Sequence, residues 1–287
     1  MTATRTVSLP SVPSLGPAMI RGAVLSPLKR PREAAAWDGA RLHVGDLRIR
    51  DRHLAAYERV CGFPTGRPEL PVSYPHLLGF PLAMRLMAAR SFPLPLLGLV
   101  HTSIGITQHH DLSPTQAYEL AVVVTGLRPH RRGTEAVVVT ELLDGGAPAW
   151  RSTSTYLSRH RTRTPAAPET PGTPEPLPAL AEWRLGADLG RRYAAVSGDR
   201  NPIHLHPLTA RLFGFPRAIA HGMWTVARCL AEFGARGPVD VTARFRAPVL
   251  LPGAVTYAAR GTAFELRSAK DGRTHVSGEV RPLGSPD

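Results

Sequence analysis

The stretch Tyr193-Ala-Ala-Val-Ser-Gly-Asp-Arg-Asn-Pro-Ile-His204 is the most informative part of the sequence. In a regular helix, the five-residue separation of Asp199 and His204 would place them about 140° apart around the axis, so their side chains would not meet. Gly198 permits unusual backbone angles and Pro202 fixes one, so we expect a rigid, irregular overhang. Such an overhang can turn a carboxylate and an imidazole toward one point, which is the arrangement that acid–base chemistry requires.

The first half of the chain contains a related stretch. Tyr57-Glu-Arg-Val-Cys-Gly62 has Tyr, Val and Gly at the same spacing as residues 193–198. In each half a loop rich in Gly and Pro, an apolar segment of helical length (77–90 and 223–233) and strand-like alternation follow in the same order. Strand-like runs are expected at residues 136–142, 153–157, 239–245, 255–259 and 276–280. We therefore expect an α+β protein in which each half forms an antiparallel sheet wrapped around a central helix.

Proline marks the boundary between the two copies. Six prolines lie between residues 162 and 178, with almost no large apolar residue among them, which indicates a linker. The predicted organisation is an irregular N-terminal arm at 1–35, a first domain at 36–160, the linker at 161–180 and a second domain at 181–287.

Composition excludes several classes of protein. The 287 residues include 35 Lys and Arg, 22 Asp and Glu and only 2 Cys. Cys61 and Cys229 are far apart, which argues against a disulfide scaffold or a zinc knuckle and fits a reducing, cytoplasmic setting. No apolar stretch reaches the roughly 18 residues that span a bilayer. The excess positive charge is scattered and lacks interleaved aromatics, so nucleic acid is not an expected partner. A basic surface also suits a ligand that bears several phosphates or an acidic carrier protein, and charge alone does not choose between them.

A second histidine stands before the apolar helix expected at 223–233. It lies in Ala220-His-Gly-Met223, seventeen residues after His204. The Gly222 N–H, at a helix start, has no partner within the helix and could polarise a carbonyl oxygen. His221 itself can brace this loop or take part in chemistry, and Asn201 can tie a turn or contact a ligand.

Together these residues resemble the MaoC-like (R)-specific enoyl-CoA hydratase and 3-hydroxyacyl-thioester dehydratase family. The segments that carry the resemblance are 193–204, 214–216, 219–223 and 245–253, and, in double-domain members, 74–81 and 96–101. The resemblance implies a double hot-dog fold, with two antiparallel sheets each wrapped around a central helix. The first domain would be a degenerate hot-dog and the second a catalytic one.

The activity that the resemblance implies is reversible addition of water to a trans-2-enoyl thioester in fatty-acid metabolism, giving the (R)-3-hydroxyacyl thioester. The acyl group would be carried by coenzyme A or an acyl carrier protein, and no metal or other cofactor is required. Asp199 and His204 would be the catalytic pair and Gly222 the oxyanion-hole amide. Residues that would bind substrate or support the site are Ser197, Asn201, His221 and Met223.

The first half departs from this pattern, because it lacks an acid and a base at the aligned positions. Ser197, Asp199, Asn201 and His204 are replaced there by Cys61, Phe63, Thr65 and Pro68. We therefore expect one active site per chain, with the first half as packing partner and Leu82 and Met84 as candidates for the wall of an acyl tunnel. Since the two halves can pair internally, both a monomer and a homodimer are compatible with the sequence.

Several alternatives stay open. On the same fold the protein could be an acyl-CoA thioesterase, or a noncatalytic subunit that binds acyl thioesters. Asp199 and His204 could form only a structural hydrogen-bonded pair. Other candidates are a metal cluster at His109-His110-Asp111, for which no further ligands are evident, the nucleophiles Ser103, Ser197 and Cys61, and a phosphate contact at Arg244 and Arg246.

Overall fold

The computed structural model describes residues 5–29, 39–162 and 176–284. Its contacts divide the chain into two compact units. Unit 1 comprises Met1–Leu47, Pro75–Ile104 and Ala117–Pro176, and unit 2 comprises Arg48–Tyr74, Gly105–Gln116 and Leu177–Asp287. The segment Arg48–Tyr74 thus groups with the C-terminal unit, because its helix packs against two helices of that unit. The predicted domain boundaries stay a prediction, and most of the proline-rich linker lies outside the described residues.

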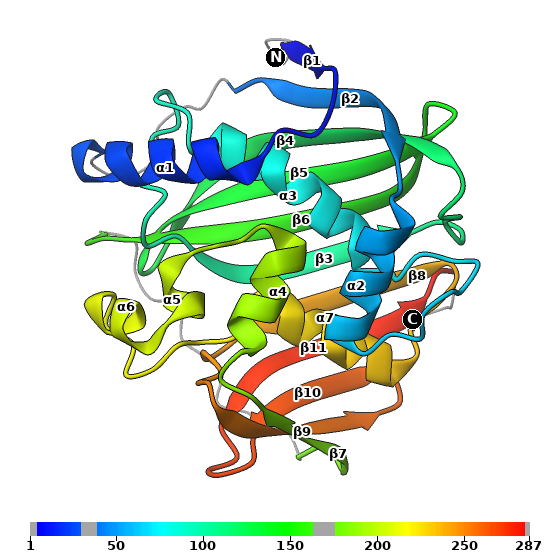
Figure 1. Ribbon diagram of the computed structural model, residues 1–287, viewed down its shortest axis with the longest axis vertical. Coiled ribbons are helices and arrows are strands. Elements are labelled where there is room, and N and C mark those ends of the chain that lie inside the picture. Colours follow the sequence, from blue (N-terminus) through cyan, green and yellow to red (C-terminus); the bar gives the residue numbers. More distant parts are fainter. Residues whose placement is uncertain (1–4, 30–38, 163–175, 285–287) are drawn as a thin grey trace. The chain divides into compact units, whose positions relative to one another are not determined.

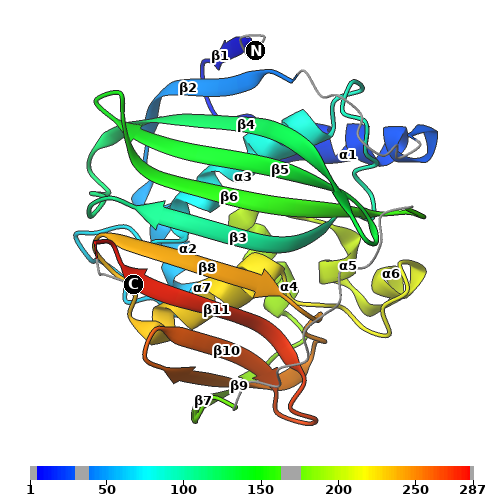
Figure 2. The ribbon, with the colours of Figure 1, turned by 180° about the vertical axis from the view of Figure 1, so that it is seen from behind.

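Unit 1 is a curved sheet with a helix on one face (Figures 1 and 2). Its strands follow the order β1-β2-β4-β5-β6-β3, in which β1 pairs with β2 in parallel and β4, β5 and β6 are antiparallel. The bounds are β1 Thr6–Leu9, β2 Arg41–Arg48, β3 Val100–Gln108, β4 Ala117–His130, β5 Gly133–Asp144, β6 Ala147–Arg159, α1 Leu15–Leu25, the 3-10 helix Ser26–Leu28 and α3 Tyr74–Met87.

The helix α3 is the one expected at 77–90, shifted three residues toward the N-terminus. Proline is favoured in the first turn of a helix, and Pro75 lies there. Gly79 lies so close to Thr140 of β5 that a Cβ at this position would overlap the threonine side chain. Leu82 and Met84 are buried, and their part in an acyl tunnel stays a prediction.

The N-terminal arm is more regular than the sequence suggests, and the expectation of an irregular arm was wrong. Residues 6–9 form β1 and residues 15–25 form α1. Pro17 does not prevent the helix, because it falls in its first turn, where a missing N–H costs little. The buried Ser26 hydroxyl donates to the Gly22 carbonyl at 2.6 Å and accepts from the Leu97 N–H at 2.9 Å. These contacts fasten the end of α1 to unit 1.

Unit 2 contains the sheet β8-β11-β10-β9-β7, which is antiparallel throughout. The bounds are α2 Asp51–Cys61, β7 Ala179–Leu185, α4 Leu189–Ser197, α5 Pro202–Leu205, α6 Pro207–Leu212, α7 Gly222–Phe233, β8 Val239–Phe245, β9 Gly253–Arg260, β10 Ala263–Ser268 and β11 Thr274–Pro282. The helix α7 lies on one face of this sheet (Figures 1 and 2), with Phe233 against Phe264 of β10 at 6.5 Å between ring centroids. Each of the five expected strand runs falls inside an observed strand. None of the described helices is long and apolar enough to cross a bilayer.

The internal repeat is confirmed in the helices that precede the two overhangs. Both α2 and α4 end at a glycine with left-handed backbone angles, Gly62 at φ 81° and Gly198 at φ 73°. A residue with a Cβ would be strained there, which explains why the repeat keeps glycine. Tyr57 and Tyr193, five residues before each glycine, are both buried.

Five histidines whose pKa burial lowers, His275 among them, make stability depend on pH. Burial lowers the pKa of His76 from 6.5 to about 4 and that of His221 to about 3, and it also lowers the pKa of His101 and of His204. Below pH 6.5 these histidines therefore bind protons in the unfolded chain and stay neutral in the folded chain. Because the unfolded state binds more protons, the free energy of unfolding falls as the pH falls through this window.

We therefore expect urea denaturation to show a lower free energy of unfolding at pH 5.5 than at pH 7.5, by on the order of 1 kcal/mol each for His76 and His221. Replacing His76 with Gln, which does not titrate, is expected to flatten this dependence relative to wild type. A variant whose pH dependence equals that of wild type would contradict the assignment of His76.

Candidate active site

The overhang predicted after residue 198 is present and is held by its own side chains. Three side-chain oxygens each accept the N–H two residues further along. Ser197 Oγ accepts from the Asp199 N–H at 3.2 Å, Asp199 Oδ1 accepts from the Asn201 N–H at 3.1 Å, and Asn201 Oδ1 accepts from the Ile203 N–H at 3.4 Å. Such turns replace the helical hydrogen bonds that Pro202 and the left-handed Gly198 prevent. Ser197 and Asn201 therefore shape the backbone of the overhang.

Asp199, His204 and His221 meet in one cluster. Their metal-ligating atoms all lie within 4.8 Å of one another. The Asp199 carboxylate is 21% exposed, whereas the two histidines are buried. The cluster is thus accessible to solvent at the carboxylate, and its acid and base groups are close enough to act on one water molecule or hydroxyl group.

His204 is held as a neutral base. Its Nδ1 lies 2.8 Å from the Ile219 carbonyl, which can only accept, so Nδ1 carries the proton and the lone pair is on Nε2. Burial lowers the pKa of His204 below 6.5, although the Asp199 charge and the Ile219 carbonyl oppose this shift. At neutral pH His204 therefore has a free nitrogen that can accept a proton.

His221 supports the other two residues. It occupies the N-cap position of α7, and its Nε2 donates to the Asp199 carbonyl at 2.9 Å. Its ring stacks on His204, with 3.7 Å between centroids and 26° between planes, and lies 4.9 Å from the Tyr193 ring. Burial and the neighbouring His204 lower the pKa of His221 to about 3, so it stays neutral. These contacts indicate that His221 positions the backbone of Asp199 and the ring of His204.

Gly222 is the first residue of α7, so its N–H lacks a partner within the helix and lies at the positive end of the dipole. A Cβ at this position would be 3.0 Å from Cε1 of Phe245, so a side chain would crowd the phenyl ring. Met223, the next residue of α7, is half-buried. Both directly follow His221, at the start of α7.

The same three side chains could in principle hold a metal ion, and their geometry does not suit one. A metal ion lies in the plane of each imidazole that binds it, and rings stacked at 3.7 Å do not direct their lone pairs at one point. This arrangement favours acid–base chemistry. Across the described ranges, Asp199, His204 and His221 form the only group of three or more such ligands.

The remaining candidates lie outside this cluster. The Oγ of Ser103 bonds Oγ1 of Thr155 at 2.7 Å, and burial raises the pKa of the Cys61 thiol, which keeps it protonated. Asp111 accepts the Gly237 N–H at 3.0 Å. Arg244 is exposed on β8. None of these residues is joined to an acid–base pair.

One residue that supports the site could not be identified from the sequence motif. His53 of α2 lies 2.8 Å from the Val196 carbonyl through Nε2 and 2.8 Å from the Tyr74 hydroxyl through Nδ1. Since a carbonyl only accepts, Nε2 donates to Val196 and Nδ1 accepts from Tyr74. Val196 is in the last turn of α4, where carbonyls lack helical partners, and stands three residues before Asp199. His53 therefore fixes the point where the overhang leaves the helix.

Comparison with known proteins identifies relatives of this chain. Residues 166–280 match the family model of the MaoC like domain. The chain is 40% identical over 248 residues to 3-hydroxyacyl-thioester dehydratase X of Mycobacterium tuberculosis, covering 84% of this chain and 88% of that protein. The crystal structure of HtdX of M. tuberculosis has a TM-score of 0.74 and 36% identity, covering 85% of this chain and 100% of that one.

The fold is supported by a more distant structure as well. An M. tuberculosis protein described as having a double hotdog fold has a TM-score of 0.52 and 12% identity, covering 87% of this chain and 95% of that one, which bears on the fold alone. The expected double hot-dog fold is confirmed, and the chain belongs to the family of MaoC-like dehydratases.

Proposed function

We propose that this protein catalyses the reversible, (R)-specific hydration of trans-2-enoyl thioesters, and the dehydration of (R)-3-hydroxyacyl thioesters, in fatty-acid metabolism. The relative that covers most of the chain is named a 3-hydroxyacyl-thioester dehydratase. The observation that carries the proposal is the convergence of the Asp199 carboxylate with a neutral His204, whose Nδ1 is bonded to Ile219 and whose Nε2 is left as a base.

In the hydration direction, Asp199 and His204 hold a water molecule against C3 of the enoyl group. His204 Nε2 takes one proton of this water as its oxygen forms the bond to C3. The electron pair of the C2–C3 double bond moves toward C1, and the thioester oxygen gains negative charge. A proton from the pair is then delivered to C2, on the same face as the new hydroxyl group.

The Gly222 N–H is the group we assign to the thioester oxygen. A hydrogen bond aimed at an atom that gains charge in the transition state lowers the barrier more than it strengthens substrate binding. In the dehydration direction the same groups act in reverse. The pair removes the C2 proton and protonates the departing hydroxyl, while the Gly222 amide stabilises the enolate.

We assign one such site to each chain. The position of Asp199 is taken in the first repeat by Phe63, whose ring stacks on Tyr57 with 6.1 Å between centroids. A packed phenyl ring cannot exchange a proton, so the first overhang serves packing. The acyl carrier is coenzyme A or a carrier protein, and both cysteines are buried free thiols, which suits a reducing cytoplasm.

The proposal is tested by following crotonyl-CoA and longer trans-2-enoyl-CoAs, with loss of the conjugated double bond and release of free thiol recorded in the same sample. A hydratase removes the double bond without releasing thiol. Release of thiol would instead identify a thioesterase, and tight binding of the substrate with neither change would identify a noncatalytic subunit.

Replacing His53 with Ala is expected to lower kcat about 10-fold or more with a smaller change in KM, because the Val196 carbonyl loses its donor and Asp199 shifts. His53→Gln, whose amide can donate to Val196 and accept from Tyr74, is expected to recover part of this loss. The matched control is Arg52→Ala, an exposed neighbour on the same helix. A folded His53→Ala enzyme with wild-type kcat would refute the positioning role.

A further inference from the structure

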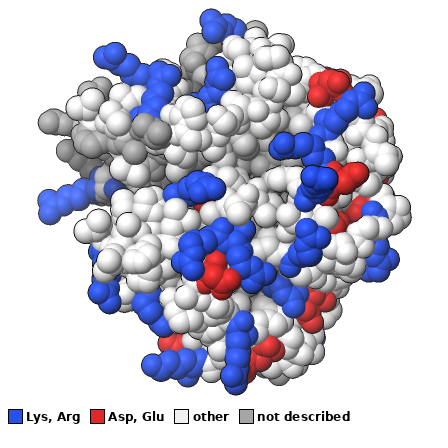
Figure 3. All heavy atoms as spheres, in the orientation of Figure 1, with Lys and Arg blue, Asp and Glu red and all other residues white. Residues whose placement is uncertain are grey.

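A second feature of unit 2 is a pocket of about 380 Å³ that contains no member of the Asp199–His204–His221 cluster. It is formed by the C-terminal end of α2, by β7 and the turn after it, by α4 and by the outer side of α7. The residues that line it are Arg59, Val60, Gly62, Glu182, Trp183, Arg184, Leu185, Gly186, Leu189, Arg192, Trp224 and Arg228. Figure 3 shows Lys and Arg side chains gathered over α2 and α4 on this face.

This pocket, called the arginine pocket below, is lined mainly by positive charge. Its lining holds four arginines and one acidic residue, Glu182. Arg192 lies 3.9 Å from Asp188, a loose and exposed ion pair. Arg59 and Arg184 are exposed, and neither forms an ion pair with another residue that the structure describes. Two guanidinium groups are thus available to an incoming anion.

Arg228 is held in place before any ligand arrives. Its guanidinium lies 3.9 Å from the centre of the Trp183 ring, and its NH2 is 2.9 Å from Glu232. Trp183 also stacks on Tyr257, with 5.6 Å between ring centroids. Gly62 leaves the space that this guanidinium uses, since a Cβ there would lie 3.2 Å from it. A planar guanidinium fixed in this way loses little conformational freedom when it binds an anion.

We propose that the arginine pocket binds the phosphate groups of a phosphate ester. Several guanidinium groups around one pocket match the charge and the several acceptor oxygens of such groups. The volume suits a small molecule. The ester can be the nucleotide of a coenzyme A thioester, which rests on the proposed function, or a free phosphorylated metabolite, which does not.

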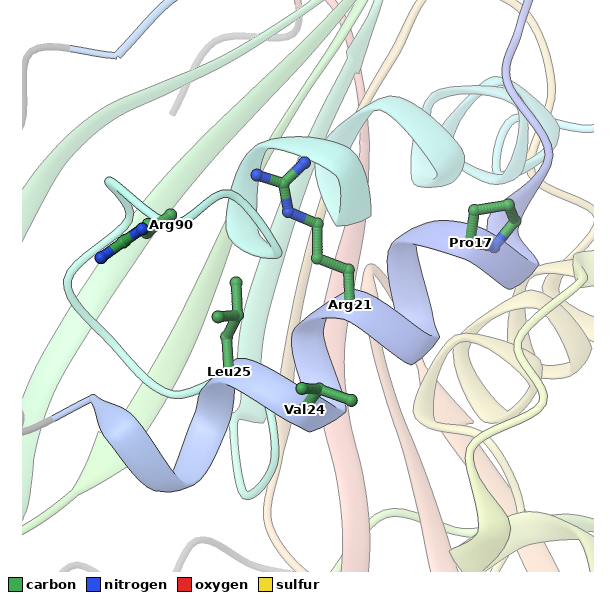
Figure 4. Close-up of a pocket in the computed structure, with 5 residues that line it drawn as sticks. All are labelled: Pro17, Arg21, Val24, Leu25 and Arg90. Carbon is green, nitrogen blue, oxygen red and sulfur yellow. The ribbon is translucent and has the colours of Figure 1, made fainter.

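Another hollow, of about 630 Å³, lies in unit 1 and does not offer the same chemistry. It is lined by Pro17, Arg21, Val24, Leu25 and Arg90. Figure 4 shows that the guanidinium groups of Arg21 and Arg90 do not point at one another. Arg244 and Arg246, the arginines that the sequence suggested for a phosphate, do not line the arginine pocket.

The test is calorimetric titration of the full-length protein with adenosine 3′,5′-bisphosphate, with adenosine as the uncharged control. We expect the bisphosphate to bind and adenosine not to bind. Arg59→Ala and Arg184→Ala change exposed side chains and are each expected to weaken the Kd about 10-fold. Arg52→Ala, an exposed arginine of the same helix outside the pocket, is expected to leave it unchanged. Absence of binding, or equal Kd values in all three variants, would overturn the proposal.

The source of the phosphate ester is distinguished by kinetics. If it is coenzyme A, Arg59→Ala and Arg184→Ala raise KM for crotonyl-CoA and leave KM for crotonyl-pantetheine, which lacks the nucleotide, unchanged. If it is a free metabolite, the Kd for the bisphosphate weakens and both KM values stay as in wild type. Failure of the proposed function would appear as absence of turnover, and the titration would still show whether the pocket binds the bisphosphate.

Discussion

Asp199→Asn is expected to lower kcat for the hydration of crotonyl-CoA by about 100- to 10,000-fold. Asparagine keeps the size of the side chain, and its oxygen can still accept the Asn201 N–H that orders the overhang. The change therefore removes the negative charge and the capacity to exchange a proton while the backbone stays in place. The measurement is kcat of the purified variant, with its fold checked by thermal unfolding.

The same variant carries a second, independent prediction. The Asp199 charge raises the pKa of His204 against the larger effect of burial, so its removal lowers the pKa of His204 further. The acidic limb of the residual kcat/KM against pH, where His204 gains its proton, is expected to move to lower pH. Asp188→Asn, an exposed carboxylate just before α4, is the matched control and is expected to change neither quantity. Wild-type kcat in Asp199→Asn would exclude this residue from the chemistry.

Gly190→Ala is expected to reduce activity and stability together. A Cβ on Gly190, in the first turn of α4, would overlap the carbonyl oxygen of His204 and lie 3.0 Å from its carbonyl carbon. Backbone atoms cannot rotate away as a flexible side chain can, so either α4 or the residue that carries the base must move. Overpacking of this kind costs about 1 to 3 kcal/mol. In the proposed mechanism His204 is the base, and a shift of such a group by even 1 Å costs about 100-fold in rate.

The control for this prediction is Gly16→Ala in α1. A Cβ at Gly16 meets nothing within 4 Å, and alanine favours helix over glycine by about 1 kcal/mol. Gly16→Ala is therefore expected to match or exceed wild-type stability with unchanged kcat. Urea denaturation and kcat of both variants give the comparison. If Gly190→Ala kept wild-type kcat and stability, as expected for Gly16→Ala, the prediction that the close approach of α4 to His204 positions this residue would be wrong.

The parts of the site that the sequence predicts are those that local chemistry determines. Gly198, Pro202 and the side chains of Asp199 and Asn201 build the overhang within six residues, so their spacing alone indicates it. The helix expected at 223–233 was predictable for the same reason, because its buried residues recur at helical spacing. These local rules place Asp199 and His204 near one another before any tertiary contact is known.

What the sequence does not reveal depends on contacts between distant segments. His53 is 143 residues from Val196, and nothing around it marks it as a donor to that carbonyl. The arginine pocket is likewise formed by residues of α2, β7, α4 and α7, which are far apart in the sequence. Along the chain, its arginines are therefore indistinguishable from scattered surface charge. The regularity of the N-terminal arm arises from the pairing of β1 with β2 and the packing of Ser26 against Leu97. Proline-rich composition argues against such order, and tertiary contacts outweigh it.

The central claim is that Asp199 and His204 act as one acid–base unit that adds water with (R) configuration. The most direct measurement is the configuration and rate of formation of 3-hydroxybutyryl-CoA from crotonyl-CoA, for wild type, Asp199→Asn, His204→Gln and the double variant. The account predicts only the (R) product from wild type, and a double variant no slower than the slower single variant, because groups that act as a unit are not additive. An (S) or racemic product, or turnover by the folded double variant at the wild-type rate, would contradict it.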